Sequence, residues 1–116
     1  MKLELFYVPT GDLAASLGLY RDTFGATELW REGETTAALT FPGTDAQVML
    51  DASDPSAPAG PMFVVDSVAD FHADLPAGLT VVEAPAAILG GSLAVYADGG
   101  GTILYVLDQA DDSGPT

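Results

Sequence analysis

The spacing of apolar side chains changes several times along the chain and outlines the expected elements. Apolar residues on both faces, with Leu3, Leu5 and Tyr7 on one and Phe6 and Val8 on the other, predict a buried strand over residues 3–9. From about residue 12 to residue 24 the apolar positions recur every three or four residues, which predicts a helix that ends at Gly25. Shorter apolar runs then predict three further strands, at residues 26–31, 35–41 and 46–51.

The same order of elements returns after a break. Residues 52–61 hold three prolines and no large apolar side chain, which predicts a linker. A strand at 62–65, a short helix capped by Ser67, and strands near 79–83, 92–97 and 102–108 complete the pattern. The chain of 116 residues is therefore expected to form a single α+β domain of two βαβββ modules, with the ranges 1–116 for the domain, 3–51 and 62–108 for the modules, and 109–116 for an acidic, disordered tail.

The charge balance excludes several kinds of partner. Three basic residues face seventeen acidic ones, for a formal net charge of −14, which opposes binding to nucleic acid or to an anionic membrane surface. No apolar run is long enough to span a bilayer, no leader-like segment opens the sequence, and a cytoplasmic location is expected. The acidic surface either serves solubility or attracts a cationic small molecule or a basic protein.

Two segments resemble a known family. The first reads DLAASLGLYRDTFG (residues 12–25), and the second reads ADGGGTILYV (residues 97–106), in which Gly99 stands where the family usually has proline. With the paired modules, these segments make about residues 3–108 similar to the vicinal oxygen chelate superfamily, which includes glyoxalase I, the extradiol dioxygenases and the bleomycin-resistance proteins. The resemblance implies a cupped, eight-stranded mixed sheet and a homodimer.

In the metalloenzymes of that superfamily, four side chains hold a divalent metal. Matched motif to motif, these positions fall on Leu5, Met49, Gly60 (or one residue either side) and Tyr105. Leucine and glycine offer no donor atom, and a thioether is a poor ligand for a hard cation. Shifting the frame by one residue provides only Glu4. The sequence therefore predicts this fold with neither a metal nor another cofactor.

Other catalytic arrangements find little support. The single histidine, His72, is expected on the polar surface of the short second helix, although a general base remains the alternative. Ser92 lacks the surroundings of a nucleophile elbow, and no Ser-His-Asp set can be assembled. Glu28, Glu32 and Glu34 flank Trp30 either as the acidic lip of a pocket or as an ordinary charged hairpin.

An apolar, aromatic pocket is what remains. Strand alternation groups Leu5 with Tyr7 and Gln47 with Met49, and such side chains either bind a flat or apolar molecule or simply fill the core. The leading hypothesis is metal-independent binding of an apolar or cationic small molecule, such as an antibiotic, without catalysis. The alternatives are a metal-dependent lyase or dioxygenase of the same superfamily and an accessory domain that binds a basic partner. The candidate ligand-binding residues are Leu5, Tyr7, Trp30, Gln47, Met49 and Tyr105.

Overall fold

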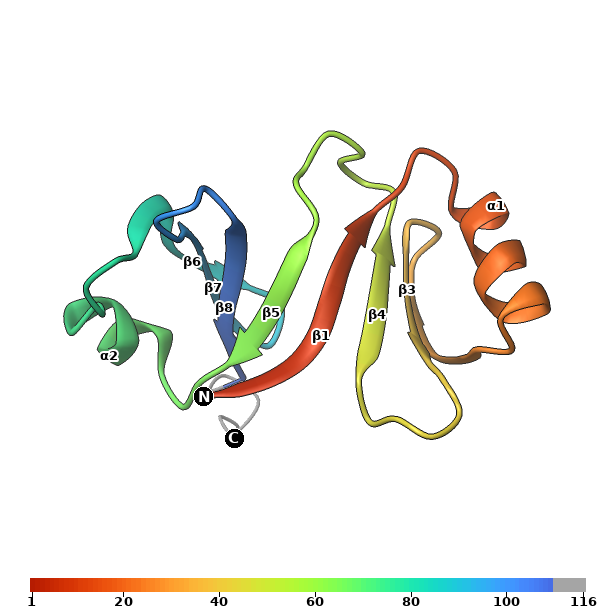
Figure 1. Cartoon of the computed structure of the whole chain (residues 1–116), viewed down its shortest axis with the longest axis horizontal. Helices are drawn as coiled ribbons and strands as arrows, with labels where there is room; N and C mark the ends of the chain where they lie inside the picture. The colour runs from red at the N-terminus through yellow and green to blue at the C-terminus, as the bar shows by residue number, and fades with distance from the viewer. Residues whose placement is uncertain (110–116) are drawn as a thin grey trace. The chain divides into compact units, whose positions relative to one another are not determined.

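The computed structural model describes residues 1–109 and divides the chain into two compact units (Figure 1). The N-terminal unit is Leu5–Ala59, and the C-terminal unit runs from Gly60 onward and includes Met1–Glu4. The division lies inside the predicted linker, while residues 110–116 of the predicted tail lie outside the described part. No helix within residues 1–109 is long and apolar enough to cross a membrane.

Both units have the predicted βαβββ order. The strands and helices are β1 (Lys2–Pro9), α1 (Leu13–Leu17) continued by a π-helical segment η1 (Gly18–Thr23), β2 (Thr27–Glu32), β3 (Thr36–Thr40), β4 (Gln47–Asp51), β5 (Gly60–Val64), α2 (Val68–Ala73), β6 (Thr80–Ile88), β7 (Gly91–Ala97) and β8 (Ile103–Asp108).

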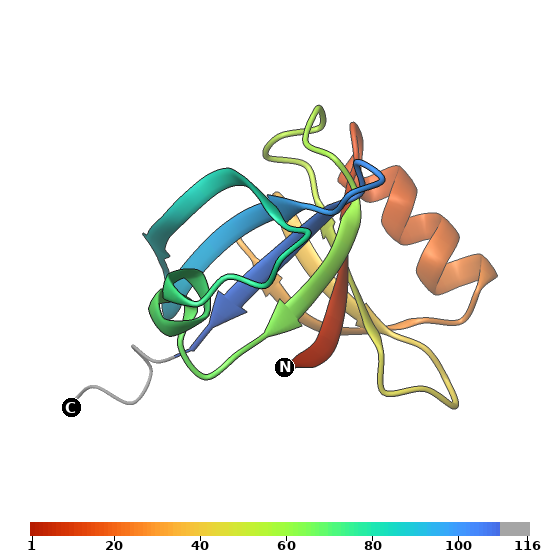
Figure 2. The ribbon, with the colours of Figure 1, turned by 60° about the vertical axis from the view of Figure 1, so that its left-hand side comes forward.

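The strand pairing is the same in both units. In the N-terminal unit the order is β2-β3-β4-β1, with β1 parallel to β4 and the other pairs antiparallel. In the C-terminal unit the order is β6-β7-β8-β5, with β5 parallel to β8 and the other pairs antiparallel (Figure 2). Eight strands of mixed direction with two helices, counted over residues 1–109, confirm the predicted α+β fold class.

Local sequence accounts for the helix boundaries. Asp12 caps α1 by accepting a hydrogen bond from the Ala15 amide at 3.0 Å, and Ser67 caps α2 by accepting one from the Asp70 amide at 3.1 Å. Gly25 has a φ of 79°, a backbone conformation that favours glycine and ends the helical segment where predicted.

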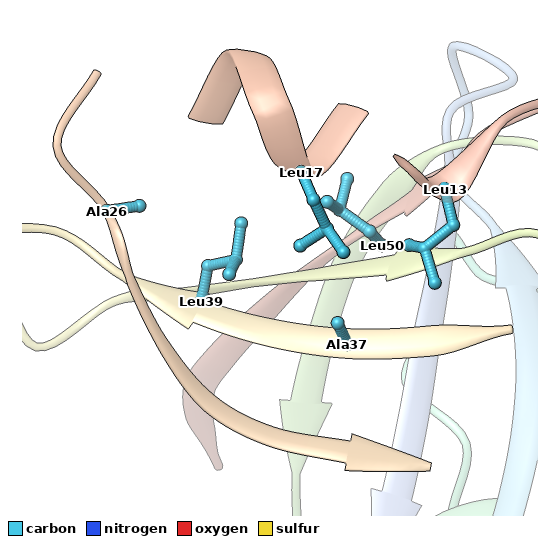
Figure 3. Packing of buried hydrophobic residues seen from close by; sticks show 6 residues of the cluster. All are labelled: Leu13, Leu17, Ala26, Ala37, Leu39 and Leu50. Carbon is cyan, nitrogen blue, oxygen red and sulfur yellow. The ribbon is translucent and has the colours of Figure 1, made fainter. Parts of the chain in front are cut away.

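The core of the N-terminal unit lies between α1 and the sheet. Leu13 and Leu17 point from the helix toward Leu39 and Leu50, both of which are fully buried (Figure 3). The C-terminal unit has a corresponding cluster in which α2 packs on its sheet through Val68, Ala94, Tyr96 and Val106. In each unit, therefore, one sheet face is fixed by its helix, and strand alternation turns the intervening side chains to the other face.

Two strands extend by two or more residues beyond their predicted ranges. β5 begins at Gly60 rather than at residue 62, so it takes two residues from the predicted linker. β6 continues to Ile88 rather than ending at residue 83, and it contains Pro85. β6 pairs only with β7 within the described residues, and such an edge strand tolerates a proline that a central strand would not.

Candidate functional site

The face opposite α1 in the N-terminal unit carries five of the six candidate residues. Alternation had grouped Leu5 with Tyr7 and Gln47 with Met49, and the cross-strand register places Leu5 beside Gln47 and Tyr7 beside Met49. Met49 pairs in turn with Ala38, and Ala38 pairs with Trp30. Four neighbouring strands thus bring Tyr7, Met49, Ala38 and Trp30 into one row across the sheet.

Exposure varies strongly along this row. Tyr7 is 8% exposed and Trp30 is 41% exposed, whereas Leu5, Gln47 and Met49 are half-buried. The partly exposed tryptophan at the edge strand β2 is the most accessible aromatic group of the set. The row therefore combines a held phenol, a soft thioether and an accessible indole, which together suit contact with a flat apolar molecule.

A buried carboxylate that the sequence analysis missed lies on the same face. Asp51 follows Met49 by two residues and accepts a hydrogen bond from the Tyr7 hydroxyl, with 2.6 Å between Tyr7 Oη and Asp51 Oδ2. Its other oxygen, Oδ1, accepts bonds from the Thr36 hydroxyl at 3.1 Å and from the Ser53 amide and hydroxyl at 2.9 and 2.7 Å. The only sequence signal for this role is the alternation of Gln47, Met49 and Asp51.

These hydrogen bonds keep Asp51 ionised. Burial by itself raises the pKa of this carboxyl, but the hydrogen bonds from Tyr7, Ser53 and Thr36 outweigh burial and lower the pKa below its usual value. The Tyr7 hydroxyl donates its proton to Asp51. The carboxylate thus fixes the orientation and polarity of the Tyr7 phenol.

Tyr105, the sixth candidate, lies in the C-terminal unit. It pairs with Met62 on β5 and with Val95 on β7, and it is 6% exposed. Its neighbour Val106 packs against α2, so alternation directs Tyr105 to the face opposite α2. Tyr105 therefore occupies, within its own unit, the same kind of face that carries the other five candidates.

The prediction of a surface histidine is corrected in one respect. His72 lies on α2 but is half-buried, with its ring stacked on Tyr96 at a centroid distance of 5.9 Å. Its Nδ1 lies 2.8 Å from the Tyr96 hydroxyl oxygen, within hydrogen-bonding distance. Burial raises the pKa of that phenol. The histidine therefore belongs to the packing between α2 and β7, because its neighbour Tyr96 is fully buried.

Sequence comparison adds the family. Residues 2–103 match the Glyoxalase/Bleomycin resistance protein/Dioxygenase superfamily. The chain belongs to this superfamily. Among curated proteins no sequence match was found.

Solved structures of this superfamily fold resemble the chain at low sequence identity. Methylmalonyl-CoA epimerase from Mycobacterium tuberculosis is 19% identical, with a TM-score of 0.66 over 94% of this chain and 88% of the other. The Streptomyces coelicolor epimerase in complex with 2-nitronate-propionyl-CoA is 18% identical, with a TM-score of 0.68 over 95% and 98%. A Legionella pneumophila structure described as an NAD-dependent benzaldehyde dehydrogenase is 18% identical, with a TM-score of 0.76 over 90% and 97%. These similarities establish the fold.

The positions that the resemblance assigns to metal ligands carry side chains that do not suit a metal. Leu5, Met49 and Gly60 provide no nitrogen or oxygen side-chain donor. A Cβ atom added at Gly60 would lie 2.4 Å from the carbonyl oxygen of Ile103, so β5 approaches β8 too closely for any side chain at that position without a backbone shift. No cluster of three His, Asp or Glu side chains suited to a metal ion occurs within residues 1–109.

Proposed function

We propose that this protein is a metal-independent binding protein for an apolar, planar small molecule, with cationic molecules preferred. The observation that carries the proposal is the row of Tyr7, Met49 and Trp30 on the face opposite α1. Stacking on an accessible indole and contact with an adaptable thioether favour flat molecules without selecting a single one. Leu5 and Gln47, on the same strands and face, would contribute an apolar contact and an orienting amide.

Charge supports the preference for cations. Asp51 places an ionised carboxylate directly behind the Tyr7 hydroxyl, and the chain as a whole carries a formal charge of −14. A cation is drawn toward such a molecule over long distances, and a cation above an indole or phenol ring gains further attraction. The same field repels anions, so a binding protein of this composition selects by charge as well as by shape.

The proposal includes Tyr105 as the aromatic ligand-binding residue of the C-terminal unit. It also includes a cytoplasmic location and a homodimer. A homodimer is supported by the edge strand β6, where Val81, Val82 and Ile88 are exposed. An apolar edge of this kind is commonly covered by a partner. In size-exclusion chromatography with light scattering, Val82→Asp should have a lower molar mass than the unmodified protein because the charge disrupts the dimer. Identical molar masses would exclude β6 from the interface.

The central test is calorimetric titration of the EDTA-treated protein with planar organic cations and with matched neutral and anionic analogues. Saturable binding of a cation is expected without metal. Trp30→Ala should weaken this binding about tenfold through the loss of stacking, while Phe24→Ala should leave it unchanged because Phe24 is an exposed aromatic residue outside the row.

Two results would contradict the proposal. One is equal affinity of the Trp30→Ala and unmodified proteins, which would remove the row from the site. The other is binding that occurs only after Mn²⁺, Fe²⁺, Ni²⁺ or Zn²⁺ is added back, which would favour the metal-dependent enzyme. In the unmodified protein, quenching of the fluorescence of the single tryptophan provides an independent readout of ligand contact.

A further inference from the structure

A pocket lies on the α1 side of the N-terminal unit, on the opposite side of the sheet from the row described above. Its volume is about 360 Å³, near the lower end of the roughly 300–1,000 Å³ typical of ligand pockets. The pocket is open to solvent. One face of the helical segment and the end of the β2–β3 hairpin form its walls. The lining residues are Leu13, Ala14, Leu17, Arg21, Arg31 and Glu34.

The pocket gathers two of the three basic residues of a strongly acidic chain. Arg31 donates two hydrogen bonds to the Glu28 carboxylate, with Nε–Oε2 and NH2–Oε1 distances of 3.0 and 2.8 Å. Arg21 donates a third to Oε1 at 3.2 Å. The hydrogen bond from Arg31 is the main cause that lowers the pKa of Glu28, so this carboxylate stays charged and anchors both guanidinium groups.

A β-bulge makes this arrangement possible. In a regular strand, residues three apart point to opposite faces. β2 contains an extra residue between the Glu28–Leu39 pair and the Trp30–Ala38 pair. The bulge turns Glu28 and Arg31 to the same face, which is the α1 side, and it leaves Trp30 on the other. Local backbone geometry thus holds the Arg31 guanidinium ready at the pocket.

Both arginines retain unused donors. A guanidinium has five N–H groups, and each of these side chains is about 40% exposed. Beyond the three bonds to Glu28, neither arginine hydrogen-bonds any other group in residues 1–109. Glu34, on the opposite side of the hairpin turn from Arg31, makes no ion pair with a described residue. The pocket therefore offers cationic donors, an anionic acceptor and apolar walls.

We propose that this pocket binds a small zwitterion of the α-amino-acid class with an apolar side chain. The carboxylate of the ligand would accept hydrogen bonds from Arg21 and Arg31, its ammonium group would lie toward Glu34, and its apolar side chain would contact Leu13 and Leu17. A zwitterion suits this chain better than a simple anion because it has no net charge for the acidic surface to repel. The site is independent of the row on the other face.

The test uses L-leucine as the probe and two analogues that each lack one charge, isocaproate and isopentylamine. Two-dimensional amide NMR of the full chain follows the signals of residues 13–21 and 31–34 during titration. Leucine should give saturable shifts there, and each analogue should bind at least about tenfold more weakly, since each loses one charged contact. Arg21→Gln should also weaken leucine binding about tenfold, whereas Lys2→Gln, which removes the remaining cation, should not.

Glu34→Gln separates the zwitterion from a simple anion. This exposed turn residue can be changed without disturbing the core, and the variant should bind leucine about as weakly as it binds isocaproate. If Arg21→Gln fails to fold, Arg21→Lys replaces it. This variant keeps the positive charge but lacks the guanidinium group, so it should also bind leucine more weakly than the unmodified protein. No saturable shift with leucine would overturn the proposal, as would equal binding of leucine and isocaproate by the unmodified protein, which would indicate an anion site only.

Discussion

The two units share one topology but use the carboxylate at the end of their last strand in opposite ways. Asp51 closes β4 on the face opposite α1 and holds Tyr7 through its hydroxyl. Asp108 closes β8 on the face toward α2, where it accepts hydrogen bonds from the amides of Val68 and Ser92 at 2.6 and 3.0 Å. Asp51 thus orients a side chain on the face opposite the helix, whereas Asp108 links the start of α2 to β7 through backbone hydrogen bonds.

The difference arises from a register shift of one residue. The segments Val48-Met49-Leu50-Asp51 and Tyr105-Val106-Leu107-Asp108 look like copies in the sequence. In β4, however, Leu50 packs on the helix and the aspartate comes one residue later, whereas in β8 Val106 packs on the helix and the aspartate comes two residues later. Since side chains alternate, a shift of one residue reverses the face. Sequence likeness between the units is therefore no guide to equivalent roles.

The largest expected effect is a loss in the free energy of unfolding, which should differ between the cores of the two units. Leu50→Ala should lower the free energy of unfolding by about 2–5 kcal/mol because it leaves a cavity beneath α1. Val106→Ala, at the corresponding place beneath α2, should cost about 2 kcal/mol because fewer carbon atoms are removed. Chemical denaturation measures both. Leu29→Ala on the exposed edge should change little, and a comparable loss there would show that the buried clusters do not dominate stability.

A smaller effect distinguishes the two aspartates. Asp108→Ala should lower the free energy of unfolding by about 1–3 kcal/mol because it leaves backbone amides of α2 and β7 unpaired. Ligand binding on the face opposite α1 should be unchanged in the folded variant. Asp51→Asn should instead weaken the binding of a cation on that face because it removes the carboxylate charge. Calorimetric titration would measure this loss of affinity. If both variants lost binding equally, the division of roles between the units would be wrong.

The pH dependence of stability should single out Asp51. Its pKa is lowered in the folded protein, so its contribution to stability is present above the unfolded value, about 3.9, and is lost as the pH falls through the folded value. Acid denaturation followed by circular dichroism should show stability decreasing below about pH 4. In Asp51→Asn this decrease should be smaller, and an unchanged acid profile would contradict the assigned hydrogen-bond network.

The smallest expected effect concerns the packing of α2. His72→Ala removes the contact with the Tyr96 hydroxyl and the stacked ring, and it should cost about 1 kcal/mol. His72→Phe keeps the ring and should recover part of the loss. Thermal denaturation would measure both variants, and a His72→Ala protein as stable as the unmodified one would return His72 to the surface role first predicted.

Local signals in the sequence account for most of the fold. Helical spacing, the caps Asp12 and Ser67, and the stop at Gly25 depend on neighbours within a few residues, so they could be predicted correctly. The start of β5 at Gly60 could not be, because it depends on close approach to Ile103, 43 residues away along the chain. Proline-rich composition alone indicated a linker there.

Strand alternation predicted which candidate residues of one strand share a face, but not which residues of different strands come into contact. Alternation and the resemblance together grouped Leu5 with Tyr7 and Gln47 with Met49, whereas the pairing of Tyr7 with Met49 comes from the register of β1 and β4. The role of Asp51 could not be predicted, because its partner Tyr7 is 44 residues away and only the parallel register of β1 and β4 brings them together. The bulge that gathers Glu28 and Arg31 on one face is likewise invisible to a pattern that assumes strict alternation.

The assignment of residues to units has a consequence for how the chain folds as it is synthesised. By the time Ala59 has left the ribosome, every strand and helix of the N-terminal unit is available, and that unit can fold before the rest is made. Residues 1–4, although made earlier, belong with the C-terminal unit, in which β5 pairs in parallel with β8, the unit's last strand along the chain. The first residues of β1 therefore reach complete native surroundings only after β8 has been made.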